Sequence, residues 1–290
     1  MNRSRSSTAL AGARDPRGYA LAQLTVGGTP LECVRAAAAA GFAGVGLRIG
    51  ARRRDERYEG ALVGDPVATA EVRAALDDSG MRLTSVCGCQ LFPDTRDDDL
   101  DALIEAAAEL RAPVVATQGF DPDLDRYADR YARFAESARS AGMRIGLEWM
   151  AYSAVKTLAS ALEIVGRSTG TGAGIVVDAL HADRSGTTVE AIARIEPARV
   201  VLAHWCDARR LTGTATEDAL RAEARTARLW PGEGALPLAA LARALPPTVD
   251  IELEVVDARD AGEPPVVRAR RSRAALDRYA ASIAAPAGRR

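Results

Sequence analysis

Short runs of β-branched and apolar residues alternate with longer segments rich in alanine, leucine and arginine from residue 19 onward. The short runs have the length and composition of buried strands, and the longer segments have the periodicity of amphipathic helices. Eight strands are predicted at Tyr19–Val26, Ala43–Ile49, Leu83–Leu91, Pro113–Gln118, Ile145–Met150, Gly174–Leu180, Val200–Trp205 and Val249–Val255. Eight helices, one after each strand, are predicted at Pro30–Ala40, Pro66–Asp78, Asp98–Leu110, Leu124–Ala141, Val155–Ser168, Thr188–Ile195, Pro237–Leu245 and Val266–Ile283.

Capping signals support several of these helix boundaries. Thr29 and Asp65 each precede a proline that can occupy the first helical position, and Thr187 is followed three positions later by the acidic Glu190. Three predicted helices end in a glycine directly before the next strand, namely Gly41, Gly80 and Gly142.

Eight consecutive strand and helix units, without a change of composition between the halves, predict a single (β/α)₈ barrel over residues 19–290. An open doubly wound sheet is the alternative, but no G-x-G-x-x-G motif follows an early strand. Residues 1–18 carry arginines and serines and are predicted to be a disordered tail. Two long segments that follow strands, Gly50–Gly64 and Asp207–Leu236, are predicted to be loops that cover the active-site face.

Composition and charge narrow the classes of partner. A net charge of −1 gives no electrostatic signal for nucleic acid or an anionic membrane, so we expect a small-molecule substrate. The four cysteines have neither the spacing of a zinc site nor the density of a disulfide scaffold, which favours a reducing cytoplasmic location. No stretch has the character of a signal peptide or a membrane span. Lys156 is the only lysine, which disfavours a Schiff-base mechanism.

Polar residues near the ends of the last four predicted strands are the strongest candidates for chemistry. They are Glu148, Asp178, His204 and Glu254. A single acid at a strand end is more often a helix cap or a solvated residue. A buried charge, however, is tolerated only when it is paired or bound to a metal. Three carboxylates and one imidazole at one point form a ligand set for a hard divalent cation.

Five motifs carry a family resemblance. Gly146-Leu-Glu148-Trp, Val177-Asp178-Ala-Leu-His181, Ala203-His204-Trp-Cys-Asp207, Arg228-Leu-Trp-Pro231-Gly-Glu-Gly234 and Leu253-Glu254-Val resemble the xylose isomerase-like TIM barrels, over essentially residues 19–285. That superfamily includes sugar isomerases and epimerases, inosose and 3-dehydroshikimate dehydratases, and endonuclease IV.

The resemblance implies roles for individual residues of this chain. It makes Glu148, Asp178, His204 and Glu254 the ligands of one divalent ion, Mn²⁺ or Mg²⁺, with Co²⁺ or Zn²⁺ as alternatives. By similarity to the ketose epimerases, Glu148 and Glu254 also act as catalytic acid and base. His181 and Arg228 then bind the substrate. An endonuclease is disfavoured, because those relatives use many histidines around three zinc ions and this chain has two.

The expected chemistry agrees with this set of ligands. A metal ion that binds two oxygens of a hydroxy-ketone polarises the carbonyl, a glutamate removes the neighbouring proton, and the metal stabilises the enediolate. The prediction is therefore an isomerase or epimerase of a small keto-sugar or polyol. A lyase that dehydrates a keto-inositol, a 3-keto-glycoside or 3-dehydroshikimate is the alternative from the same superfamily. A non-catalytic sugar-binding protein is the alternative of a different class. For the oligomeric state, the resemblance suggests a homodimer through the active-site face.

The eighth strand offers two glutamates, because Glu252 and Glu254 face the same side. Glu254 is preferred as the ligand, since the resemblance places the ligand glutamate close to the following loop. Glu252 would then lie one layer deeper, and a buried carboxylate there requires an arginine partner or a proton.

Other residues are given alternative roles. Trp230, Gln118 and Gln90 are predicted to contact the substrate, whereas Trp149 and Trp205 could pack beneath helices. His181 could instead be a hydrogen-bond partner of Asp178, and Asp207 could either hold His204 or cap the following segment. Cys206 is disfavoured as a nucleophile. The run Arg52-Arg-Arg54 is either solvated or a phosphate clamp.

Overall fold

Eight parallel strands form one closed barrel in the order β1 to β8, with β8 paired to β1, in the computed structural model. The structure describes residues 18–170, 172–260 and 262–284, so the tail expected over residues 1–18 lies outside the described part except for Gly18. The strands are β1 (Ala20–Ala22), β2 (Gly44–Arg48), β3 (Arg82–Cys87), β4 (Val114–Gln118), β5 (Arg144–Glu148), β6 (Gly174–Asp178), β7 (Val200–Trp205) and β8 (Ile251–Leu253). The predicted (β/α)₈ barrel is confirmed.

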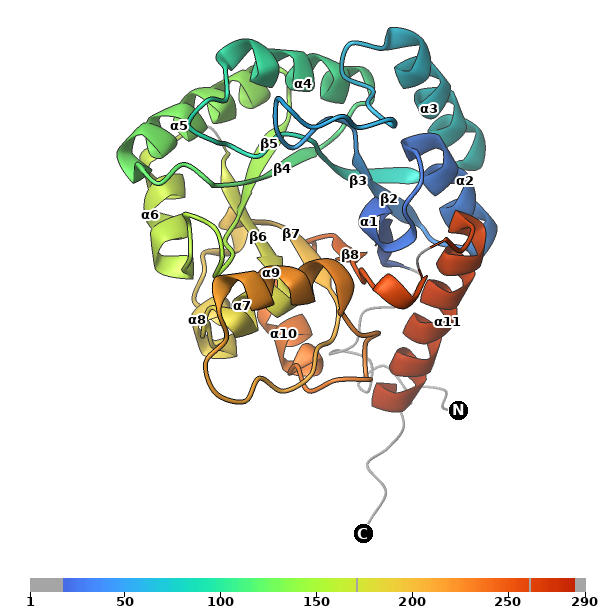
Figure 1. The fold of residues 1–290 in the computed structure, drawn as a ribbon. Coiled ribbons are helices and arrows are strands. Elements are labelled where there is room, and N and C mark those ends of the chain that lie inside the picture. The colour runs from blue at the N-terminus through green and yellow to red at the C-terminus, as the bar shows by residue number, and fades with distance from the viewer. Residues whose placement is uncertain (1–17, 171, 261, 285–290) are drawn as a thin grey trace, which may run out of the picture.

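Most helices surround the outside of the barrel (Figure 1). The helices are α1 (Gln23–Val26), α2 (Pro30–Ala40), α3 (Pro66–Ser79), α4 (Asp97–Glu109), α5 (Leu124–Ser140), α6 (Leu158–Arg167), α7 (Ala179–Arg184), α8 (Val189–Ala193), α9 (Glu217–Thr226), α10 (Leu238–Ala244) and α11 (Pro265–Ala284). The last helix packs beside α2, which brings the two ends of the barrel together. No helix of the described residues is long and apolar enough to cross a membrane.

Two predicted strands are too long because each runs directly into a helix. The first strand ends at Ala22, and Gln23–Val26 forms α1. The hydroxyl of Thr25 there donates to the Leu253 carbonyl and accepts from the Val255 amide, which ties α1 to β8. The sixth strand likewise ends at Asp178, whose carboxylate accepts from the His181 amide and caps α7.

One of the two long segments contains more structure than predicted, whereas Gly50–Gly64 has no helix or strand. Asp207–Leu236 was expected to be a loop, but it contains α9, an amphipathic helix that buries Leu220 and Ala224. The residue that caps α8 is Thr188 rather than Thr187. Thr29 and Asp65 cap α2 and α3 as predicted.

The main core lies between the strands and the surrounding helices. A smaller apolar cluster lies on β4, β6 and β7, and it consists of Val114, Ala116, Val176, Val201 and Leu202. Glycine is required where a neighbouring side chain approaches the strand backbone. A Cβ on Gly146, for example, would lie 2.6 Å from the side chain of Val176. The strands can therefore pack closely, and their carboxyl ends lie near one another.

Candidate active site

Strand register aligns the polar residues of β6, β7 and β8. Asp178 pairs with His204, and His204 pairs with Glu252. On the other side Gln118, at the end of β4, pairs with Glu148 at the end of β5. Glu254 follows the last residue of β8. The carboxyl ends of five consecutive strands thus supply polar side chains to one region, where the active site of this fold is found.

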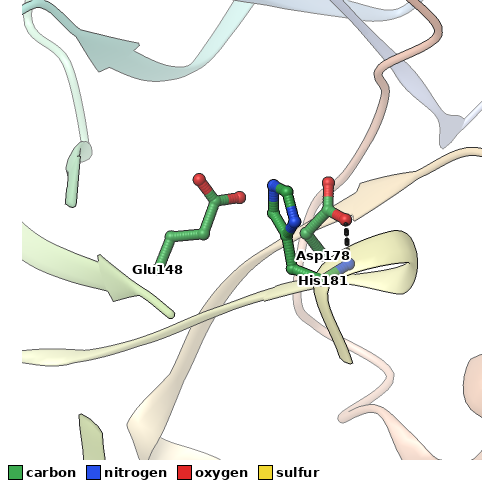
Figure 2. Close-up of side chains that lie close together, drawn as sticks. All are labelled: Glu148, Asp178 and His181. Carbon is green, nitrogen blue, oxygen red and sulfur yellow. Dashed lines mark hydrogen bonds between the residues drawn. The ribbon is translucent and has the colours of Figure 1, made fainter. Parts of the chain in front are cut away.

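Two groups of potential metal ligands meet there. Donor atoms of Glu148, Asp178 and His181 lie within 4.8 Å of one another, and so do those of Asp178, His204 and Glu254. Figure 2 shows Glu148 facing Asp178 and His181 across the site. All five side chains are buried. Asp178 belongs to both groups, so the two groups form one cluster.

His204 lies between carboxylates on both sides of its ring. Its Nδ1 is 2.9 Å from Glu148 Oε1 and 3.9 Å from Glu254 Oε2, and its Nε2 is 3.6 Å from Glu252 Oε2. Burial lowers the pKa of His204, but the charge of Glu254 and the hydrogen bonds to Glu148 and Glu252 outweigh it and raise this pKa well above its usual range. For Glu148, burial raises the pKa, but the hydrogen bond and charge of His204 outweigh it, so the net shift is downward.

Glu252 lies deeper than Glu254 and is held by hydroxyl groups. Its Oε1 accepts hydrogen bonds of 2.7 Å from both Thr84 and Ser85. A Cβ on Gly46 would lie 2.0 Å from Glu252 Oε2, so only glycine leaves room for this carboxylate. The two possibilities for a buried Glu252 were an arginine partner or a proton. In the structure two hydroxyls donate to this carboxylate, and the His204 imidazole lies 3.6 Å away.

Arg228 is the arginine of the site, and it is buried. It donates to Asp178 Oδ2 at 2.7 Å and approaches Glu254 Oε2 at 3.0 Å. Burial lowers the pKa of Arg228, but the charge of Asp178 and other nearby groups raise it well above its usual range. For Asp178, burial raises the pKa, but the charges of Arg228 and His181 outweigh it and lower it strongly. Burial raises the pKa of Glu254, and Arg228 offsets this only in part.

Cys206 and His181 also lie beside Arg228. The guanidinium donates to Cys206 Sγ at 3.3 Å, and burial raises the pKa of this thiol to about 12, so the thiolate that a nucleophile requires is disfavoured. His181 Nε2 is 3.4 Å from Arg228 Nη2, and the ring of Tyr152 packs edge-on against the imidazole at 5.5 Å. The contact of His181 with Asp178 is made by its backbone amide.

Asp207 holds the turn that follows Arg228. Its Oδ1 accepts from the amides of Ala208 and Leu236, and its Oδ2 accepts from those of Gly232 and Gly234, all at 2.8–3.0 Å. Of the two roles considered for Asp207, the structure supports the capping of the following segment.

A cavity of about 320 Å³ opens above the cluster. The predicted site residues that line it are Glu148, His181, His204, Arg228, Glu254, Gln118 and Gln90. Gln90 donates to Gln118 at 3.2 Å, and Gln118 donates to Glu148 at 2.8 Å. Asp178 lies behind them, held by Arg228.

Trp230 is not among the described residues that line the cavity. It is 6% exposed and packs in the main core. Trp149 and Trp205 are also buried, and Trp149 donates to the Ser185 hydroxyl.

Several lining residues were missed by the sequence analysis, including Tyr152, Phe120, Arg48 and Arg225. Arg225 lies in the last turn of α9, and Arg228 follows the end of this helix. Arg225 was missed because α9 was read as a loop.

The donor set fits a divalent cation. Four buried carboxyls, those of Glu148, Asp178, Glu252 and Glu254, face one guanidinium and the His204 imidazole. With the carboxylates and the guanidinium charged and His204 neutral, as a metal ligand must be, three negative charges remain, and a divalent ion would offset two of them. Oxygen donors with one imidazole suit Mn²⁺, Mg²⁺ or Zn²⁺. Each carboxylate oxygen has more than one acceptor position, so the contacts with Arg228 leave capacity for a metal.

Comparisons with known proteins agree with this geometry. The family model described as "Xylose isomerase-like TIM barrel" matches residues 34–279. A solved structure of IOLI protein with a bound zinc atom has a TM-score of 0.70 at 15% identity, over 92% of this chain and 97% of that one. A D-tagatose 3-epimerase-like protein has a TM-score of 0.66 at 19% identity, over 91% and 97%. The probable 3-DHS dehydratase AsbF of Bacillus anthracis has 0.65 at 17%, over 87% and 96%.

This chain spans only 42% of a further match, a xylose isomerase-like TIM barrel/4-hydroxyphenylpyruvate dioxygenase fusion protein, with a TM-score of 0.72 and 21% identity. A search of curated proteins by sequence gives no match.

Proposed function

Because the chain belongs to the xylose isomerase-like TIM barrel family, we propose that it is a divalent-metal-dependent isomerase or epimerase of a small keto-sugar or polyol. The observation that carries the proposal is the buried cluster of Glu148, Asp178, His204 and Glu254 at the carboxyl ends of β5 to β8. These four residues would hold the ion. The zinc atom in the IOLI structure supports a metal site, and the similarity to a D-tagatose 3-epimerase-like protein supports the proposed reaction class.

The bound ion would supply Lewis-acid polarisation of a substrate carbonyl. Glu148 and Glu254 then act on the substrate proton, since both line the cavity and both approach the same nitrogen of His204. Their pKa values are shifted in opposite directions, downward for Glu148 and upward for Glu254. Such a pair suits a base and an acid that share one proton-transfer reaction. Gln118 donates to Glu148 and orients its carboxylate.

Substrate contacts are assigned to the residues around this pair. His181, Arg228, Gln90 and Gln118 line the cavity and offer hydrogen bonds to hydroxyl and carbonyl oxygens. A carbohydrate or polyol is the proposed partner, and neither nucleic acid nor a membrane is. A cytoplasmic location and a homodimer are part of the same proposal.

A dehydratase is the second candidate, since the AsbF relative is a probable 3-DHS dehydratase and proton removal beside a carbonyl also begins the loss of a β-hydroxyl. The test is incubation of the metal-loaded protein with ketoses in D₂O, followed by NMR. Deuterium entering next to the carbonyl without loss of water is the expected result. Formation of an enone would favour the dehydratase.

The matched variants are Glu148→Gln in the site and Glu163→Gln on the exposed face of α6. Exchange should be lost only in the first. Stoichiometric metal and ketose binding without any exchange would instead indicate a non-catalytic sugar-binding protein.

A further inference from the structure

The active-site cavity has opposite charge at its two ends. Its floor carries Glu148, Glu252 and Glu254. Its mouth opens into an outer hollow of about 450 Å³, in which the arginines Arg52, Arg53, Arg221 and Arg225 gather. A metal ion at the floor would offset the negative charge of the carboxylates there. The proposed function names no group that would offset the positive charge of the arginines at the mouth.

Among the described residues that line the outer hollow, Glu56 is the only acid, and it is already bound. Arg48 pairs with its Oε2 at 2.6 Å, and the Arg52 amide donates to the same oxygen at 2.6 Å. Glu56 therefore pairs with Arg48, which lies below the hollow, and among the described residues its side chain forms no ion pair with the four arginines.

Two of the four arginines are occupied by other contacts. Arg53 pairs with Asp55 at 3.3 Å and lies over the ring of Phe92. Arg221 pairs with Asp218 at 3.0 Å and lies over the ring of Tyr152. Because Arg53 and Arg221 already have these partners, we do not assign them to ligand binding.

Arg52 and Arg225 differ from them. Neither guanidinium forms an ion pair or a hydrogen bond with another residue in the part of the chain that the structure describes. Both residues line the outer hollow and also the inner cavity above the carboxylates. They come from segments that are far apart in the sequence. Arg52 belongs to the segment after β2, and Arg225 belongs to α9. We refer to Arg52 and Arg225 as the mouth arginines.

The wall between floor and mouth is continuous. Gln90 and Phe120 line both the inner cavity and the outer hollow. The ring of Phe120 stacks on that of Phe92 with centroids 5.0 Å apart, which gives the wall a rigid apolar surface. A ligand that reaches the floor at one end can therefore lie along Phe120 and place its other end between the mouth arginines.

We propose that the mouth arginines form an anion subsite for a carboxylate or phosphate group at the far end of the substrate. Arginine binds both groups through charge-assisted hydrogen bonds. The substrate class is thus an anionic keto-sugar or keto-polyol, with its hydroxy-ketone at the floor and its acid group at the mouth. The identity of the floor end rests on the proposed function, whereas the anion subsite rests on the mouth arginines.

The test compares ketoses that differ only at the far end. Binding of D-fructose, D-fructose 6-phosphate and D-fructuronate to the Mn²⁺-loaded full chain is measured by calorimetry. We expect at least one anionic ketose to bind about tenfold more tightly than D-fructose, the effect of one good charge-assisted hydrogen bond. The stronger of the two anionic ligands distinguishes a phosphate from a carboxylate subsite.

Three variants locate the effect. Arg52→Gln and Arg225→Gln should each remove most of the anion preference and leave the affinity for D-fructose unchanged. Arg35→Gln, on the exposed face of α2, removes the same charge far from the cavity and should keep the preference. Wild-type protein without a preference, or a preference that survives in both mouth variants, would overturn the proposal. Absence of binding by every anionic ketose would do the same.

Repeating the titrations after chelation separates the two proposals. If the anion preference persists but no ketose binding depends on the metal, the subsite stands and the proposed function fails. If ketoses bind only with metal and without regard to charge, the proposed function stands and the subsite fails.

Discussion

At the scale of single residues, the position of Glu252 beside His204 is the feature with the clearest consequence. A histidine that binds a metal through one nitrogen commonly donates its other N–H to a carboxylate, which fixes the ring. Here Nε2 faces Glu252, and Nδ1 faces Glu148 and Glu254. Thr84 and Ser85 hold Glu252 in place from the other side.

Replacing Glu252 by Gln should therefore weaken metal binding roughly 10- to 100-fold, the usual loss when such a partner is removed. Metal titration of the purified variant measures this. Ser85→Ala, which removes one hydrogen bond to Glu252, should have a smaller effect. With only two histidines in the chain, ¹⁵N NMR of labelled imidazoles reports directly on the His204 ring. An unchanged affinity and unchanged ring signals in Glu252→Gln would contradict the assignment.

The two histidines are expected to have separable roles. His204→Ala should empty the metal site, whereas His181→Ala should leave metal bound while activity falls. Metal analysis of the two purified variants, with activity measured beside it, makes the comparison. Because donor atoms of His181 also lie close to those of Glu148 and Asp178, loss of the metal in His181→Ala would show that His181 is a ligand.

At the scale of elements, the turn after Arg228 depends on one buried side chain. Asp207 accepts four backbone hydrogen bonds, and an amide in its place would turn one acceptor into a donor that faces N–H groups. Asp207→Asn should lower the free energy of unfolding by about 3 kcal/mol. Urea unfolding measures the change, with Asp218→Asn at an exposed position of α9 as the control. Equal stability of the two variants would argue against this role.

The start of α5 provides a test by pH. Asp121 is fully buried, and its carboxylate accepts hydrogen bonds from Arg126 and from the Asp123 amide. Burial raises the pKa of Asp121, but these bonds and the nearby arginines outweigh it and lower the pKa. A lowered carboxyl pKa stabilises the fold above the unfolded-state value, near 4, and this contribution is lost as the pH falls below it.

Asp121→Asn should therefore be about 1–2 kcal/mol less stable at neutral pH. Its stability should also fall less steeply than that of the wild type between about pH 5 and pH 2. Urea unfolding at a series of pH values checks both. Asp125→Asn, at a highly exposed position of the same helix, should keep the wild-type slope. A wild-type slope in Asp121→Asn would be the contrary outcome.

Elements were predicted well where the local pattern is long and capped, and poorly where it is short. The helix at Pro30–Ala40 matches α2 in full, because Thr29, Glu32 and Gly41 determine its ends locally. The short helix α1 and the first two residues of α7 were read as strands. Tertiary contacts hold these segments, such as the hydrogen bond from Thr25 to the Leu253 carbonyl of β8, and no local pattern reveals them.

At the scale of the whole molecule, the candidate metal centre joins β5, β6, β7 and the end of β8. A cation there would bind the folded chain and not the unfolded one, and would relieve repulsion among Glu148, Asp178, Glu252 and Glu254. At a hundredfold excess over its Kd, the ion should add about 2.7 kcal/mol, or roughly 5–10 °C in the melting temperature.

Thermal unfolding with Mn²⁺, with Mg²⁺ and after chelation measures the shift. The shift should reverse with chelator and persist in Glu163→Gln. It should shrink in Glu148→Gln, which removes one ligand. An equal shift in both variants would show that the ion stabilises the protein elsewhere.

The sequence by itself determined the order of strands and helices, and therefore the closed barrel. It also placed Glu148, Asp178, His204 and Glu254 at strand ends, because these properties depend on local periodicity and on the fixed geometry of parallel strands. Only the tertiary structure decided what each side chain touches. The hydroxyl cradle of Glu252, the inward ring of Trp230 and the unpaired mouth arginines arise between elements far apart in the chain, where packing and charge in three dimensions select the partners.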